Sequence, residues 1–94
     1  MGYAERPAAT CEVKLDGERV VLGVAGELSL ASAYPLVTAL RRAAPCATAC
    51  AVDLGRVESA SPGGLEALRE VLETARSLFR VVTLEHAELI HGHL

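Results

Sequence analysis

Cysteine and histidine are the residue types in this chain that most readily bind a metal ion or act as nucleophiles. Cys46 and Cys50 are four positions apart, which is wider than the two-residue gap typical of small zinc sites. No pair of Cys or His residues completes a tetrahedral ligand set with them, so neither a metal nor another cofactor is predicted. The three cysteines are instead expected as reduced thiols, with Cys11 and Cys50 serving as small apolar residues of strands.

The three histidines and the acidic residues offer no catalytic arrangement. His86, His91 and His93 all lie within the last nine residues, an end that we expect to be exposed and solvated. Asp53 and Glu58 do not form a convincing pair of catalytic carboxylates, because we expect Asp53 at the end of a strand and Glu58 in a loop. The sequence therefore does not predict an enzyme.

Residues 61–64 (SPGG) are typical of a helix start. Ser61 is the expected capping residue, Pro62 occupies the first helical position, and Gly63 and Gly64 permit close packing. Backbone N–H groups at such a start can cradle an anion, but no lysine of a phosphate-binding loop accompanies them. Binding of an anion or nucleotide at Gly63-Gly64 is therefore only the third hypothesis. Because polar Ser59 and small Ala60 precede this start, we expect an accessible, shallow loop there.

Length and composition exclude several classes of protein. The 94 residues are 51% hydrophobic and 22% charged, which is typical of one small globular domain. Nine cations are scattered and the net charge is −3, so no nucleic-acid-binding surface is predicted. No uncharged stretch approaches the roughly 20 apolar residues of a membrane span. A cytoplasmic protein is expected, with a flexible arm at 1–10 and a single domain at 11–94.

The hydrophobic pattern predicts four strands. Residues 11–15 alternate apolar and charged side chains, and Asp16-Gly17 then predicts a tight hairpin turn. Residues 20–25 form a nearly continuous apolar run, which is typical of a strand covered on both faces, and Gly26 and Glu27 are expected to end it. Two further strands are expected at 49–54 and 79–84, with a polar loop at 55–60.

Helices are expected between these strands. The first runs from a cap at Ser32 to a stop at Pro45, and the second begins at Ser61 and has an apolar stripe through Leu78. Residues 85–94 are weakly typical of a short final helix. The order predicts an α/β domain with a mostly parallel sheet of four to five strands, an antiparallel N-terminal edge hairpin, and helices packed on it.

Two segments resemble motifs of the STAS domain family, which includes the anti-sigma-factor antagonists. Residues 24–33 (VAGELSLASA) are similar to the family's Gly-Glu-Leu-Asp motif. Residues 52–65 (VDLGRVESASPGGL) are similar to its second signature, in which an Asp-Leu strand end leads to an Asp-Ser-Ser/Thr-Gly-Leu loop that opens a helix. The predicted order of elements over about residues 11–90 also matches the family fold.

This resemblance implies a protein-binding switch without enzymatic activity. In the family, a serine is phosphorylated by a partner of ATPase fold that is both serine kinase and anti-sigma factor, and the phosphorylated form releases that partner. Phosphate adds about two negative charges and three acceptor oxygens at a docking surface. In this sequence Pro62 stands where the phosphoacceptor serine belongs, so the usual switch cannot operate there. Ser61 stands in place of the family's Asp, Gly63 in place of the second Ser/Thr, and Ser29 in place of the Asp of the first motif.

Three interpretations of these departures remain open. The domain binds an anti-sigma-type partner constitutively, or Ser61 or Ser59 serves as the phosphoacceptor, or the domain serves another complex. The third class includes adapter subunits of phospholipid-transport ABC systems and of stress-signalling assemblies. We expect the partner-binding residues at two loops and on one helix face: Gly26, Glu27, Leu28, Ser29, Ser59, Ser61, Pro62, Gly63, Gly64, Glu66, Arg69 and Glu70. Whether the chain also forms a homodimer, through its sheet edge or its helix surface, stays open.

Overall fold

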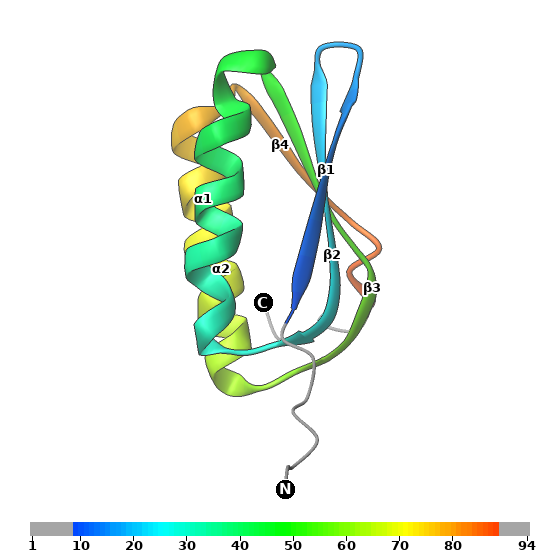
Figure 1. Cartoon of the computed structure of the whole chain (residues 1–94), viewed down its shortest axis with the longest axis vertical. Coiled ribbons are helices and arrows are strands. Elements are labelled where there is room, and N and C mark those ends of the chain that lie inside the picture. Colours follow the sequence, from blue (N-terminus) through cyan, green and yellow to red (C-terminus); the bar gives the residue numbers. More distant parts are fainter. Residues whose placement is uncertain (1–8, 89–94) are drawn as a thin grey trace, which may run out of the picture.

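A four-stranded sheet carries both helices on one of its faces (Figure 1). The computed structural model describes residues 9–88. The elements, in chain order, are β1 (Thr10–Asp16), β2 (Arg19–Leu28), a 3-10 turn η1 (Leu30–Ser32), α1 (Ala33–Ala43), a second 3-10 turn η2 (Ala44–Cys46), β3 (Ala49–Ala60), α2 (Pro62–Leu78) and β4 (Val81–Glu85).

The strands lie in the order β1-β2-β3-β4. The β1–β2 pair is antiparallel, whereas the β2–β3 and β3–β4 pairs are parallel. Gly17 has a φ of +67° in the hairpin turn that pairs Asp16 with Arg19. These observations confirm the predicted α/β fold, with a mostly parallel sheet and an antiparallel N-terminal edge hairpin.

The core lies between the sheet and the two helices. Alternate residues of β2 (Val20, Leu22 and Val24) are buried against the helices, whereas those between them are only partly covered. The prediction that residues 20–25 are covered on both faces is therefore wrong. Because β2, β3 and β4 follow one another across the sheet, two right-handed crossovers place α1 and α2 on the same face. Small and polar side chains take up most of the other face, which we call the open face.

The strand boundaries differ from the sequence prediction, most of all at the ends of β2 and β3. Residues 55–60 are not a loop but the second half of β3, which pairs with the end of β2 as far as Leu28↔Ala60. For the same reason β2 does not end at Gly26 but runs on through Glu27 to Leu28. Backbone pairing between neighbouring strands overrides the polar composition of both segments.

The prediction of a C-terminal helix at 85–94 is wrong at its first residue, because Glu85 is the last residue of β4. The rest of that prediction from residue 89 on, including His91 and His93, lies outside the described residues. So do residues 1–8 of the predicted arm. Within 9–88, neither helix has the length and apolar composition that a membrane crossing requires.

Candidate functional site

The carboxyl ends of β2 and β3 and the start of α2 meet at one end of the parallel strands. Carboxyl ends of parallel strands lie at the same edge, and the register pairs Glu27 with Ser59 and Leu28 with Ala60. The Ser59 hydroxyl donates a hydrogen bond to the Glu27 carboxylate at 2.9 Å. The structure thus brings together two segments that the sequence analysis assigned to separate loops.

Ser61 fixes the start of α2 to the end of β2. Its Oγ accepts a hydrogen bond from the Gly64 N–H at 3.0 Å, which is the expected capping contact. Its own backbone N–H donates to the Leu28 carbonyl oxygen at 3.1 Å, and its Oγ lies 3.4 Å from the same oxygen. Pro62, the first residue of the helix, is exposed.

The two glycines at the start of α2 are explained by packing. Gly64 is buried, and a Cβ at this position would clash with the carbonyl group of Leu28. A Cβ at Gly63 would lie 3.1 Å from the Cβ of Leu30. The N–H groups of Gly64 and Leu65 donate to the Oγ and the carbonyl oxygen of Ser61, so they are not free to cradle an anion.

The remaining predicted residues lie on either side of this junction. Gly26 has a φ of +95° at an irregularity in the β2–β3 pairing, where only glycine is unstrained. Ser29 donates its N–H to the Ser32 hydroxyl at 2.9 Å. On α2, Glu66 and Arg69 form an exposed ion pair at 3.5 Å, and Glu70 is exposed beside them. Arg69 and Glu70 lie more than a helical turn beyond the junction.

Sequence reasoning missed two exposed apolar side chains near the junction. Leu30 is 69% exposed although its backbone packs against Gly63, and Tyr34, one turn later at the start of α1, is 80% exposed. Leu30 lies in the η1 turn, outside both the strand alternation and the helical stripe. An apolar residue outside both periodic patterns has no expected place in the core, and this could have indicated an exposed Leu30. We call the group Glu27, Ser59, Ser61, Pro62, Gly63, Glu66 and Leu30 the junction surface.

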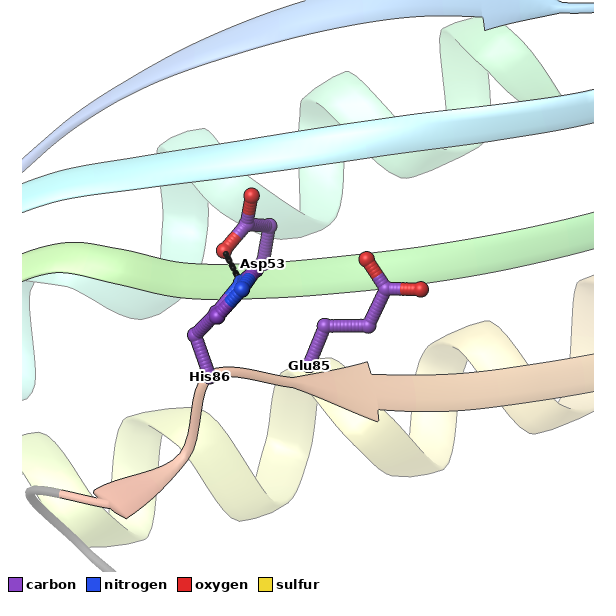
Figure 2. A group of neighbouring side chains, drawn as sticks. All are labelled: Asp53, Glu85 and His86. Carbon is purple, nitrogen blue, oxygen red and sulfur yellow. Dashed lines mark hydrogen bonds and ion pairs between the residues drawn. The ribbon is translucent and has the colours of Figure 1, made fainter.

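A second polar cluster lies on the open face. Figure 2 shows the His86 ring turned toward Asp53, and its Nδ1 lies 2.8 Å from the Asp53 Oδ1. The Gly55 N–H and His86 both hydrogen-bond the Asp53 carboxylate, which lowers its pKa, and the hydrogen bond to Asp53 raises the pKa of His86. His86 has a φ of +55°, which is uncommon for a residue with a side chain.

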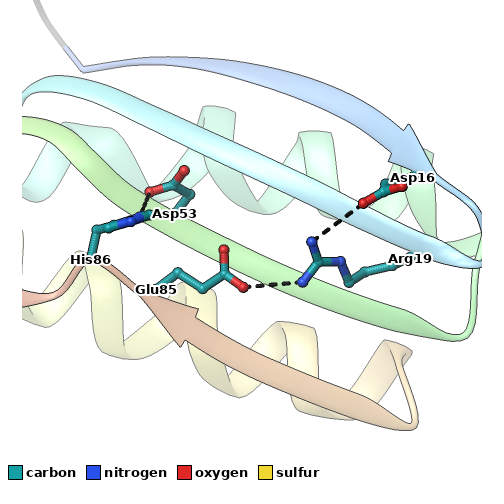
Figure 3. A network of polar contacts seen from close by, with 5 residues as sticks. All are labelled: Asp16, Arg19, Asp53, Glu85 and His86. Carbon is teal, nitrogen blue, oxygen red and sulfur yellow. Dashed lines mark hydrogen bonds and ion pairs between the residues drawn. The ribbon is translucent and has the colours of Figure 1, made fainter.

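Glu85 extends this cluster toward the hairpin. Its carboxylate forms an ion pair with Arg19 at 3.1 Å, and Arg19 also lies 3.5 Å from Asp16 (Figure 3). Ligand atoms of Asp53, Glu85 and His86 lie within 4.8 Å of one another, so their geometry is compatible with a metal ion. Each of the three side chains already has a polar partner, and a network of ion pairs accounts for the arrangement. The sequence placed His86 in a solvated tail and missed this contact.

Comparisons with known proteins agree with the fold. A family model described as "Mlab, STAS domain" matches residues 11–92. An anti-sigma factor antagonist from Mycobacterium paratuberculosis is 24% identical, with a TM-score of 0.65 over 90% of this chain and 77% of that one. An antisigma-factor antagonist STAS domain from Rhodobacter sphaeroides is 21% identical, with a TM-score of 0.61 over 86% and 88%.

The fold is also similar to that of the anti-sigma factor antagonist SpoIIAA in its unphosphorylated form. That likeness has a TM-score of 0.61 at 11% identity and covers 89% of this chain and 80% of the other. No curated protein matches the sequence significantly. At these identities the solved structures establish the fold, and the family model establishes the family.

Proposed function

Since this chain belongs to the STAS domain family, we propose that it is a non-catalytic protein-interaction domain that binds an anti-sigma factor of the ATPase-fold kinase type. The observation that carries the proposal is the junction surface, in which Glu27, Ser59 and Ser61 hold the ends of two strands and the start of α2 together. Exposed Leu30 and Pro62 supply apolar area beside the charged pair Glu66 and Arg69. A surface of this composition suits contact with another protein.

The proposed binding is constitutive rather than switched. Pro62 has no hydroxyl to accept phosphate at the family's position. The Ser61 hydroxyl contacts both the Gly64 N–H and the Leu28 carbonyl, and the Ser59 hydroxyl contacts the Glu27 carboxylate. Phosphorylation of either serine would break an existing contact, and at Ser59 it would place phosphate against a carboxylate. Both features favour an interaction surface that keeps one state.

The alternative is an adapter subunit of a phospholipid-transport ABC complex or a stress-signalling assembly. A second observation, the proline at the family's acceptor position, favours it because a permanently bound subunit needs no release switch. The two proposals differ in the class of partner, so one experiment separates them.

The experiment is an affinity capture of the tagged chain from the cytosol of its source organism, with partners and phosphopeptides of the bait identified by mass spectrometry. We expect an ATPase-fold anti-sigma factor and no phosphate on the bait. Leu30→Asp and Glu66→Arg should abolish the capture, whereas Glu73→Arg, an exposed charge reversal farther along α2, should retain it. Recovery of transporter subunits would favour the alternative, and capture unaffected by Leu30→Asp and Glu66→Arg would contradict the junction surface.

A further inference from the structure

Strand β1 forms a free edge of the sheet along its whole length. It pairs only with β2 among the described strands, and all seven of its residues are exposed. Its side chains alternate between two faces. Cys11, Val13 and Leu15 pair with Val24, Leu22 and Val20, so they lie on the helix-bearing side of the sheet. Glu12, Lys14 and Asp16 lie on the open face.

The apolar face of β1 is left uncovered by the helices. Val13 is 43% exposed and Leu15 is 60% exposed, although both lie on the side where the core is built. A groove of about 430 Å³ runs between β1 and α1, with a lining of Val13, Leu15, Val20, Ala39, Arg42, Ala43 and Cys46. Because α1 presents small alanines here, it does not fill the space over β1. An unpaired strand edge with an apolar face is a template for pairing with another strand.

We propose that this edge binds a second copy of the chain, by antiparallel pairing of β1 with β1 about a two-fold axis at Val13. The argument is the charge pattern. The helices of both copies lie on one side of a continuous sheet only if directly opposite residues of the two β1 strands point to the same face. Helix-side residues must then pair with helix-side residues, and open-face residues with open-face residues. Registers centred on Glu12, Val13 and Lys14 meet this condition with the most residue pairs.

Only the middle register places unlike charges opposite each other. Centred on Val13, it pairs Glu12 with the partner's Lys14 at two symmetric positions, and Cys11 with the partner's Leu15 on the apolar side. The register centred on Glu12 places the two Glu12 side chains opposite each other. The register centred on Lys14 places the two Lys14 side chains opposite each other and pairs Glu12 with the partner's Asp16. Like charges directly opposite one another destabilise a strand pair, and opposite charges stabilise it.

This pairing would extend the sheet across both copies and bring the two grooves together over one apolar strip. Single-strand pairing gives a small interface, so we expect a weak dimer whose population depends on concentration. Glu12 and Lys14 lie outside the junction surface. The proposed dimer is therefore independent of the proposed function, and either can fail without the other.

A charge-exchange experiment tests the register. Lys14→Glu places four glutamates across the pair, and Glu12→Lys places four lysines there. We expect each variant alone to be monomeric in analytical ultracentrifugation under conditions where the wild-type chain dimerises, and an equimolar mixture of the two to form a heterodimer. The double variant Glu12→Lys/Lys14→Glu should dimerise like the wild type. All these positions are exposed, and circular dichroism would verify that each variant is folded.

Two results would overturn the proposal. One is a wild-type chain that stays monomeric up to its solubility limit. The other is stronger association of a Lys14→Ser variant than of the wild type, since Lys14 would then act as a guard against edge pairing. A cysteine crosslink checks the axis: in a Cys11→Ser/Cys46→Ser background, Val13→Cys should form a disulfide-linked dimer readily, because opposite Cα atoms at about 5.5 Å suit a disulfide. Faster crosslinking of Ala31→Cys, an exposed position away from β1, would contradict this geometry.

Discussion

The hydroxyl of Ser59 donates a hydrogen bond to the carboxylate of Glu27 at 2.9 Å, across the parallel pairing of β3 with β2. Both side chains are partly buried, so the contact is shielded from water on at least one side. It joins the two strand ends from which η1 and α2 depart. The orientation of the junction surface thus depends on this hydrogen bond as well as on the backbone ladder.

We predict that a negative charge at position 59 destabilises the domain. Ser59→Ala should cost about 1 kcal/mol, as a hydrogen bond to a partly exposed charged group does. Ser59→Asp should cost about 1 kcal/mol more than Ser59→Asn, its neutral match in shape, because the new carboxylate faces Glu27. Urea unfolding measures the differences, and added salt should reduce the gap between Asp and Asn. Equal stability of those two variants would show that Glu27 does not oppose charge at this position.

The packing of Gly64 against Leu28 predicts a sharp contrast between neighbouring glycines. Gly64→Ala should cost about 3 kcal/mol or leave the chain unfolded, since a methyl group meets the Leu28 carbonyl and neither backbone can yield easily. Gly63→Ala is the matched control, because the methyl there would lie 3.1 Å from the Cβ and 3.3 Å from the backbone N of Leu30, contacts that a shift of a few tenths of an ångström relieves. The helix also gains up to about 1 kcal/mol from alanine. Thermal unfolding compares the two. Comparable melting temperatures would contradict the packing argument.

Capping of α2 by Ser61 gives a third prediction. Ser61→Ala should destabilise the domain by about 1 kcal/mol, whereas Ser61→Asp should retain most of the stability because a carboxylate also caps a helix and suits its N-terminal dipole. Urea unfolding of both variants measures this. If Ser61→Ala and Ser61→Asp lose the same stability, the hydroxyl is not acting as a cap.

The three cysteines should differ in reactivity. Cys11 and Cys46 are exposed, whereas Cys50 is buried in β3, and burial raises the pKa of its thiol. Because the thiolate is the reactive form, a thiol-specific colorimetric reagent should modify two thiols quickly. The third should react only after denaturant is added. Fast reaction of all three in the folded chain would show that β3 opens readily.

Periodicity in the sequence predicted most of the fold because burial on the helix-facing side creates it. Val20, Leu22 and Val24 in β2, and the stripe of α2, carry the pattern and lie in the core. The second half of β3 carries no such pattern. Its residues 55–60 include only Val57 and Ala60 as larger apolar side chains, and they form a strand because the end of β2 supplies backbone partners. A pattern along the chain does not contain that information.

The same limit applies to the site. Ser61, Gly63 and Gly64 were predicted from helix-start chemistry, which is local. The contact of Ser59 with Glu27 joins residues 32 positions apart, and that of His86 with Asp53 joins residues 33 positions apart. Neither follows from spacing along the chain. The turn of the backbone at His86, with its positive φ, brings the ring back over the open face.

The contact between His86 and Asp53 makes stability depend on pH in a direction that can be worked out. Hydrogen bonding raises the pKa of His86 above 6.5 and lowers that of Asp53 below 3.8. The contribution of His86 is fully present below pH 6.5 and is lost as pH rises through its raised pKa. That of Asp53 is present above pH 3.8 and is lost as pH falls through its lowered pKa. The pair therefore stabilises the fold most between these two values.

We accordingly predict that the free energy of unfolding decreases as the pH rises from about 6 to 8 in the wild-type chain, through the loss of protons from folded His86. The decrease is modest because the imidazole is exposed. His86→Asn should flatten this part of the profile, and asparagine is the suitable replacement because it tolerates a positive φ. Asp53→Asn should flatten it equally, since the raised pKa of His86 depends on that carboxylate. Urea unfolding across this range measures the slope. A slope that persists unchanged in both variants would assign the pH dependence to other groups and contradict the role of this pair.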